Sequence, residues 1–288
     1  MKPIKPLKQN PWLRLMRFDK PIGIYLLLWP TYWGMWFASN GQPSVKNLII
    51  FTLGVVVMRA AGCVINDYAD RHVDGEVERT RHRPIPSGEI EPRFALLLFF
   101  ALLILALGLV LSTNFMTVQL AIVGTLLAAC YPFLKRITHL PQLGLGVAWA
   151  WAIPMAFAAE QQTLPDTLWL IVVAVICWTV AFDTYYAMVD REDDIKTGIK
   201  STAILFGKYD LLIVVVLQIM MLVFLVIAGH YFERGWTYIM GLVMAAGYFI
   251  QQHLQVRQRD KENCFRAFLN NHRVGMVIFI ALALDYRL

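Results

Sequence analysis

The chain has 288 residues, of which 58% are hydrophobic and 16% are charged. Soluble proteins carry about 25% charged residues, so this composition excludes a soluble globular domain and a disordered protein. The apolar runs are continuous, which argues against a transmembrane β-barrel, whose strands alternate apolar and polar residues. The net charge of +6 is typical of a membrane protein with basic cytoplasmic loops. We expect no nucleic-acid partner and no obligate protein partner.

Stretches of about 20 mostly apolar residues are long enough to cross a bilayer, and they predict nine spans in an all-α, polytopic membrane protein. The uncharged run at 94–134 is too long for one span, and a polar triplet at 112–114 divides it. The last span is short, so that eight spans are the alternative. The predicted spans are 21–45, 47–68, 94–111, 115–134, 143–159, 167–189, 211–232, 236–256 and 271–286. We expect one domain over 1–288, with a basic segment at 1–20.

The Lys and Arg residues fix the expected orientation. With the N-terminus in the cytoplasm, 22 of the 26 basic residues fall on the cytoplasmic side and three on the other side. The remaining one, Arg59, lies inside the second span. Such asymmetry is a strong positive-inside signal. It predicts a multi-pass protein of a bacterial inner membrane with a cytoplasmic N-terminus.

Two cytoplasmic segments, at about 67–93 and 190–209, are acidic as well as basic. The side chains Asn66, Asp70 and Asp74 are spaced i, i+4 and i+8, and Asp190 and Asp194 are spaced i and i+4. On a continuing helix each set lines one face. Like charges at this spacing are unfavourable unless a cation bridges them.

Carboxylate and amide oxygens suit Mg²⁺, which is commonly held by one or two carboxylates together with substrate phosphates. Two such clusters on the same side therefore favour two ions that hold one diphosphate. An ordinary solvated loop is the alternative for either cluster alone. The basic residues that we expect to contact the diphosphate are Arg79, Arg81, Arg83, Lys196 and Lys200.

At these residues the chain resembles a known family. The motif NDxxDxxxD at 66–74 and the motif DxxxD at 190–194, together with nine spans, are similar to those of the UbiA superfamily of intramembrane prenyltransferases. Further similarity lies in LRLMRFDKPIG at 13–23, MRAAGCVINDYADR at 58–71, RTRHRPIPSG at 79–88, YPFLKRITHLPQ at 131–142 and YYAMVDREDD at 185–194. The likeness spans essentially the whole chain and is strongest to the members that act on 4-hydroxybenzoate in ubiquinone biosynthesis.

The resemblance implies a nine-helix bundle around a central cavity. It also implies Mg²⁺-dependent transfer of a polyprenyl group from polyprenyl diphosphate to the ring carbon ortho to the hydroxyl of 4-hydroxybenzoate. Breaking the allylic bond leaves negative charge on the diphosphate, which metal ions and cationic side chains stabilise. The allylic cation must be kept from water, which a dry apolar cavity does.

Several side chains have more than one interpretation. Asp67 points away from Asn66 on a helix and is a candidate for the base that removes the ring proton, or else it holds a loop arginine. Asp183 and Tyr186 share a face near Asp190 and either position the metal-bound oxygens or pair inside the bundle.

A charge at the position of Arg59 needs a partner inside the bundle. Because the acceptor carries a carboxylate, Arg59 is a candidate to bind it through a bidentate pair. The alternatives are a structural ion pair or a contact to the diphosphate, and Arg17 is the competing carboxylate anchor.

Other functions stay open at this point. A sibling prenyltransferase acting on homogentisate, a dihydroxynaphthoate or haem has the same motifs. A membrane transporter also carries intramembrane acids, but here the acids gather at one rim. The duplicated aspartate motif argues against an alcohol phosphotransferase and against a lipid diphosphate phosphatase.

Overall fold

The fold is taken from a computed structural model, which describes residues 10–72, 75 and 80–288. The described residues form helices and no strand. The helices are α1 (Pro11–Leu15), α2 (Ile22–Ala38), α3 (Val45–Ala69), α4 (Pro92–Val110), α5 (Phe115–Ile137), α6 (Pro141–Ala150), α7 (Ala152–Gln161), α8 (Leu168–Thr197), α9 (Thr202–Phe206), α10 (Asp210–Tyr231), α11 (Trp236–Gln255) and α12 (Lys261–Asp285). The expectation of an all-α membrane protein is confirmed.

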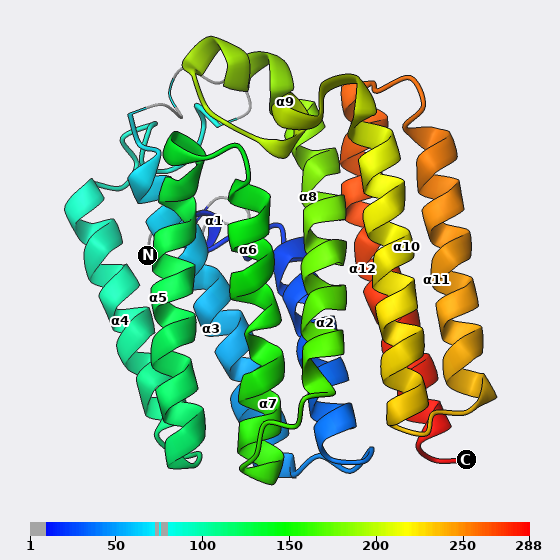
Figure 1. The fold of residues 1–288 in the computed structure, drawn as a ribbon. Coiled ribbons are helices and arrows are strands. Elements are labelled where there is room, and N and C mark those ends of the chain that lie inside the picture. The colour runs from blue at the N-terminus through cyan, green and yellow to red at the C-terminus, as the bar shows by residue number, and fades with distance from the viewer. Residues whose placement is uncertain (1–9, 73–74, 76–79) are drawn as a thin grey trace.

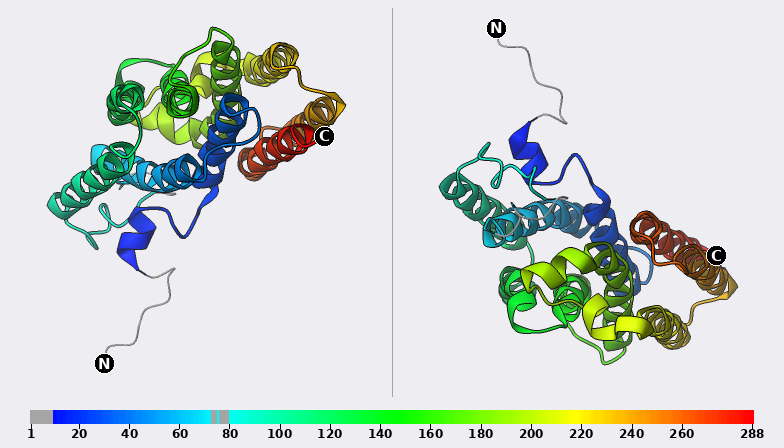
Figure 2. Two further views of the ribbon diagram at one scale, coloured as in Figure 1. Left: turned by 90° about the horizontal axis from the view of Figure 1, so that it is seen from below. Right: turned by 90° about the horizontal axis from the view of Figure 1, so that it is seen from above.

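The long helices run roughly parallel and form one bundle (Figures 1 and 2). Contacts follow the chain around a closed ring, from α2 through α3, α4, α5, α6, α8, α10, α11 and α12 back to α2. The contact between α4 and α5 is the weakest of this ring. Within this ring α8 is mostly buried, whereas few residues of α4 and α5 are buried. Exposed apolar faces on the outside of a bundle are what a lipid environment requires.

Seven segments of the described chain are helical, long and apolar enough to cross a membrane, with α6 and α7 counted as one. The helices α2, with 17 residues, and α11, with 20 residues, lie alongside them and complete the predicted nine. The polar triplet at 112–114 separates α4 from α5 as predicted, because Asn114 accepts a hydrogen bond from the Thr117 N–H at 2.9 Å and caps α5.

Four of the predicted spans differ from the structure. The first ends at Ala38 rather than at 45, because a turn at 39–41 separates α2 from α3. The fifth span is two helices, α6 and α7, with a break at Trp151. The sixth extends from the predicted end at 189 to Thr197, where Gly198 ends it with a φ of +73°. The ninth begins at Lys261, ten residues early, because Asp260 caps it through the Asn263 N–H at 2.9 Å. Hydropathy reports the part of a helix that lies in lipid, whereas the helix itself continues into water.

The direction of each helix places both aspartate motifs at one end of the bundle. The C-terminal ends of α3 and α8, the helix α9 and the connection from α11 to α12 all lie at this end, which is uppermost in Figure 1. The C-terminus of the chain lies at the opposite end. The alternation of directions that the basic residues predicted is therefore present in the fold.

Candidate functional site

The first motif lies where α3 ends. Asp70 follows the last helical residue, and its N–H donates to the Asn66 carbonyl at 3.0 Å. Its side chain is buried and forms an ion pair with Lys135 at the end of α5. The neighbouring Arg136 donates to the Ala69 carbonyl at 2.5 Å. The end of α5 therefore holds the first motif in place.

The helix that carries this motif is shorter than the spacing suggested. The helix α3 ends at Ala69, and the described residues 70–72 form a turn. Asp74 itself lies outside the described residues, as does Arg79. Asn66 and Asp70 stand together at the end of α3, and the place of Asp74 in the predicted row stays a prediction.

The second motif does lie on a continuous helix. Asp183, Asp190 and Asp194 are all within α8, and Asp183 interacts electrostatically with Asp190 two turns along the helix. Tyr186 packs instead against Phe268 of α12, with ring centroids 4.8 Å apart. The ring of Tyr186 therefore packs inside the bundle, in agreement with one of its two interpretations.

Tyr131 of α5 lies in the electrostatic field of charged groups on both motif helices. This side chain interacts electrostatically with Asp70 near the first motif, with Asp183 on the helix of the second motif, and with Arg59 of α3. The backbone strengthens the link, since the Lys200 N–H donates to the Lys135 carbonyl at 3.0 Å. The last turn of α5 thus contacts the first motif and the segment that follows the second motif.

Arg59 occupies the point where this polar region meets an apolar cavity. Its guanidinium lies over the Trp149 ring, 5.6 Å from the centroid. It also packs closely on Gly23 of α2, where any Cβ atom would overlap it. Its Nε is buried and has no hydrogen-bond partner among the described residues. The guanidinium also forms a side-chain hydrogen bond with Tyr131, so that Nε is the donor left without a partner, which is costly for a buried group.

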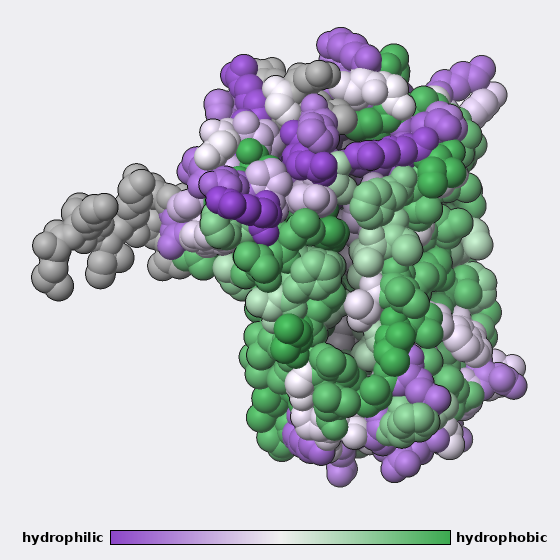
Figure 3. Space-filling model, turned by 90° about the vertical axis from the view of Figure 1, so that its left-hand side faces the viewer, coloured by the Kyte–Doolittle hydropathy of each residue, from purple (hydrophilic) through white to green (hydrophobic). Residues whose placement is uncertain are grey.

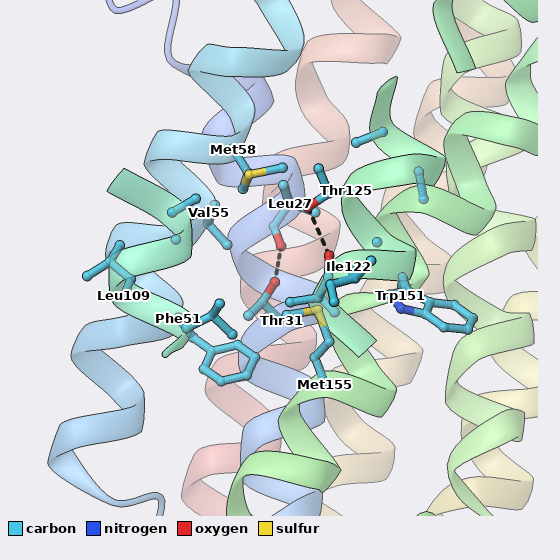
Figure 4. Close-up of a pocket in the computed structure, with 18 of the residues that line it drawn as sticks. Leu27, Thr31, Phe51, Val55, Met58, Leu109, Ile122, Thr125, Trp151 and Met155 are labelled. Carbon is cyan, nitrogen blue, oxygen red and sulfur yellow. Dashed lines mark hydrogen bonds between the residues drawn. The ribbon is translucent and has the colours of Figure 1, made fainter. Parts of the chain in front are cut away.

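The cavity below Arg59 has a volume of about 400 Å³. Its walls come from α2, α3, α4, α5, α6 and α7. Seen from the side of α4 and α5, the surface is apolar over most of its height and hollowed, with hydrophilic residues gathered at both ends (Figure 3). The wall residues shown in Figure 4 include Leu27, Phe51, Val55, Met58, Leu109, Ile122, Trp151 and Met155.

The threonines in this wall do not make it polar. The Thr31 hydroxyl donates to the Leu27 carbonyl at 2.7 Å, and the Thr125 hydroxyl donates to the Ala121 carbonyl at 2.8 Å (Figure 4). Such bonds to the preceding turn satisfy the hydroxyl within its own helix. The wall therefore suits a hydrocarbon chain.

Asp67 is fully buried and doubly paired. Arg17 donates to both of its carboxylate oxygens at 2.8 and 2.9 Å, and Arg83 donates to one of them at 3.0 Å. This geometry favours the second interpretation of Asp67, a carboxylate that holds loop arginines, over a base facing the ring. It also engages Arg17 and Arg83, so neither lines the cavity in this arrangement.

We expect Asp67→Ala to destabilise the protein, because it leaves two arginines without their shared partner. Removing one partner of a buried ion pair costs about 3–5 kcal/mol. The guanidiniums keep 23% and 16% of their side-chain surface exposed, so the loss should fall at the lower end of that range. Unfolding in detergent measures it. If Asp67 were also the base, folded Asp67→Asn would show a kinetic isotope effect with ring-deuterated acceptor that the wild type lacks.

The remaining predicted diphosphate ligands stand apart from the cavity. Arg81 is exposed and donates to the His82 ring at 3.2 Å. Lys196 is 74% exposed and lies 3.6 Å from Asp193. Lys200 donates to the Ile137 carbonyl at 3.0 Å. These cations surround the motif end without converging on one point.

A comparison with protein families decides the identity of the fold. Residues 27–281 match the model of the UbiA prenyltransferase family. The chain belongs to the UbiA prenyltransferase family. The expected family is therefore confirmed.

Curated UbiA relatives match over nearly their whole length. A 4-hydroxybenzoate octaprenyltransferase of Saccharophagus degradans is 53% identical, over 99% of this chain and 96% of the relative. One of Ectopseudomonas mendocina is 56% identical, over 96% of this chain and 94% of the relative. One of Yersinia pestis is 52% identical, over 97% of each chain.

Solved UbiA structures share the fold. A UbiA homologue from Aeropyrum pernix K1 superposes with a TM-score of 0.81, at 22% identity, over 91% of this chain and 97% of that one. A homologue from Archaeoglobus fulgidus, bound to GPP and Mg²⁺, superposes with a TM-score of 0.72, at 19% identity, over 96% of this chain and 99% of that one.

The donor chemistry of the two motifs fits Mg²⁺. Asn66, Asp70, Asp190 and Asp194 offer the amide and carboxylate oxygens that this ion prefers. Among the described residues no three acidic, histidine or cysteine side chains form a preassembled cluster. A magnesium site completed by substrate phosphates needs only one or two carboxylates from each motif, so this arrangement is compatible with it.

Sequence reasoning missed three side chains of this site. Tyr131, Lys135 and Trp149 contact Arg59 or Asp70, yet no role was expected for them. The segment YPFLKR at 131–136 carried part of the family resemblance, and that was the available signal. Their spatial partners are too distant along the chain for any spacing rule to find.

Proposed function

We propose that this UbiA protein transfers an octaprenyl group from octaprenyl diphosphate to the ring carbon ortho to the hydroxyl of 4-hydroxybenzoate, in an Mg²⁺-dependent step of ubiquinone biosynthesis. The names of relatives 51–56% identical support this acceptor and chain length. One observation carries the proposal: Arg59, whose Nε is buried without a hydrogen-bond partner among the described residues, lines the apolar cavity and interacts electrostatically with Asp183 on the helix that carries the second motif.

The motif end binds the diphosphate in this proposal. Asn66 and Asp70 from one side, and Asp190 and Asp194 from the other, would hold Mg²⁺. When bound, the metal supplies positive charge that stabilises the departing diphosphate. Lys135, already paired with Asp70, adds a fixed cationic group at the same place.

The cavity accepts the prenyl chain and excludes water from the reacting carbon. Its lining of Leu, Ile, Val and Met side chains has satisfied hydroxyls only, so hydrocarbon is its natural content. A dry wall prolongs the life of an allylic cation, because water is the competing nucleophile. Trp149 and Tyr131 place electron-rich rings near the position where that cation forms.

Arg59 binds the acceptor carboxylate. Its forked guanidinium matches a carboxylate bidentately, and Gly23 leaves room for it in one orientation. This contact holds the benzoate ring with its far edge toward the diphosphate and the reacting prenyl carbon. Asp183 and Tyr131 flank the guanidinium and steady it.

An acceptor panel tests the function. Purified protein in lipid vesicles is given labelled octaprenyl diphosphate and Mg²⁺ with 4-hydroxybenzoate, homogentisate or a dihydroxynaphthoate, and haem is assayed with its own prenyl donor. We expect labelled product with 4-hydroxybenzoate alone. Product from another acceptor and none from 4-hydroxybenzoate would replace the proposed activity with that of a sibling enzyme.

The same proposal puts the motif end in the cytoplasm and the protein in the bacterial inner membrane. A cysteine at the exposed Ser87 should react with an impermeant thiol reagent only after the membrane is opened, whereas one at the exposed Gln42 should react in intact cells. Gln42 is preferred to Gly41, which has a φ of +79° and lies against Tyr286. The background is Cys130→Ala, because Cys130 is the exposed cysteine. The reverse labelling pattern would invert the topology.

A further inference from the structure

A buried carboxylate outside the two motifs anchors the second one. Asp210, the first residue of α10, is fully buried. Arg259, in the connection between α11 and α12, donates to it through Nε at 3.0 Å and Nη2 at 2.8 Å. Arg191 of α8 donates to its other oxygen. The Leu211 N–H donates to it at 2.6 Å.

Arg191 lies in the middle of the second motif, directly after Asp190 and three residues before Asp194. Successive residues on a helix point about 100° apart. A guanidinium held at Asp210 therefore fixes the rotation of α8 and with it the direction of both motif carboxylates.

A second contact also ties the second motif to the C-terminal helices. Lys261 at the start of α12 donates to Glu192 at 2.8 Å. Arg191 and Glu192 are thus both tied to the C-terminal helices, and Arg259 also donates to the Lys208 carbonyl at 3.1 Å. The exposed pair is screened by water and contributes little, so the buried Asp210 is the principal anchor.

The ion pairs of Asp210 are better suited to orienting the motif helix than to stabilising the fold. Burying an ion pair stabilises a fold weakly, and apolar residues of similar volume serve at least as well. An arginine fork, in contrast, fixes direction because its donors are planar and rigid. Side chains that orient metal ligands commonly change metal affinity about 10–100-fold when removed.

We propose that Asp210 is a positioning residue, which sets the geometry of Asp190 and Asp194 toward divalent metal through Arg191. This inference rests on the proposed function, since that assigns Asp190 and Asp194 to the metal. In this proposal Asp210 determines the metal affinity, although Asp210 itself touches neither metal nor substrate.

The test measures metal binding directly. Wild type, Asp210→Asn, Arg191→Gln and the double variant are titrated with Mn²⁺ in the presence of inorganic pyrophosphate, and the electron paramagnetic resonance signal of free Mn²⁺ reports binding. Mg²⁺ dependence of turnover is the second measurement. Asp285→Asn is the matched control, because Asp285 is also a buried carboxylate that pairs with an arginine, Arg234, but at the opposite end of the bundle.

We expect Asp210→Asn to weaken Mn²⁺ binding about 10-fold or more, with the Mg²⁺ concentration for half-maximal turnover rising in parallel. The double variant should bind no more weakly than Asp210→Asn, because two residues of one pathway are not additive. Asp285→Asn should bind as wild type.

Unchanged Mn²⁺ affinity in folded Asp210→Asn overturns the positioning role, provided that Asp190→Asn loses binding. Additive losses in the double variant overturn transmission through Arg191. If Asp190→Asn itself binds Mn²⁺ normally, the metal assignment in the proposed function is wrong. If Asp210→Asn fails to fold, the same titration of Arg191→Gln tests the proposal, because that variant leaves Asp210 paired with Arg259.

Discussion

Asp70→Asn and Asp190→Asn are each expected to lower turnover by at least about 10³-fold while the protein stays folded. Removing one group that stabilises developing negative charge lowers the turnover rate about 10²–10³-fold. The loss of either carboxylate also lowers the affinity for the metal. The substitution Asp70→Asn also removes the ion-pair partner of Lys135. Water can solvate the Lys135 side chain, because 21% of its surface is exposed. Initial rates with labelled octaprenyl diphosphate measure the effect.

Asp193→Asn is the control within the same helix. Asp193 stands beside the motif carboxylates on α8 but pairs with the exposed Lys196, so its loss should leave turnover within about threefold, as surface pairs contribute little. EDTA should abolish the activity of the wild type, and added Mg²⁺ should restore it. Full activity of metal-free enzyme, or equal losses in Asp193→Asn and Asp190→Asn, would contradict the metal assignment.

Arg59→Ala is expected to raise the KM for 4-hydroxybenzoate about 10- to 100-fold and to leave the KM for octaprenyl diphosphate nearly unchanged. A hydrogen bond to a charged group contributes about 1.5–3 kcal/mol, and each 1.4 kcal/mol is a factor of ten in affinity. The unpartnered Nε is the reason to expect a ligand there. Steady-state kinetics with each substrate varied in turn provide the measurement.

Arg59→Lys separates charge from geometry at this position. Lysine keeps the positive charge but cannot make the forked contact, so we expect only partial recovery of the KM for 4-hydroxybenzoate. A methyl ester of the acceptor lacks the carboxylate and should be equally poor with wild type and Arg59→Ala. Equal losses for both substrates would assign Arg59 to the diphosphate or to the structure of the bundle.

The sequence allowed the spans to be predicted because lipid imposes one strong requirement on them. A spanning helix must be apolar along its length, and this signal located α3, α4, α5, α8 and α10 within a few residues at the ends that lie in lipid. It could not reveal the extension of α8 to Thr197 or the early start of α12 at Lys261, because these turns leave the membrane and carry charges. Caps such as Asp260 set those ends, and a cap is a local signal that hydropathy does not contain.

The candidate site could be predicted only where its residues are close in sequence. The pairs Asn66 with Asp70 and Asp190 with Asp194 follow from helical spacing, and Arg59 from its position inside a span. The ion pairs of Asp67 with Arg17 and of Asp70 with Lys135 join residues 50 and 65 positions apart. Their formation depends on how the helices pack, which no spacing rule supplies.

The helices α4 and α5 make little contact beside the hollow of Figure 3. This feature affects which concentration of the prenyl donor determines the rate. In the proposed function the long-chain donor is dissolved in the bilayer, a two-dimensional solvent, and the hollow beside α4 and α5 lies in the apolar face of the molecule. The concentration of the donor at the enzyme is a mole fraction among lipids. Diluting the vesicles with buffer of the same benzoate and Mg²⁺ concentration therefore leaves the rate per enzyme unchanged, while adding inert phospholipid to the same vesicles lowers it. The benzoate, in contrast, obeys ordinary bulk molarity, and the two substrates therefore reach one site from two different phases.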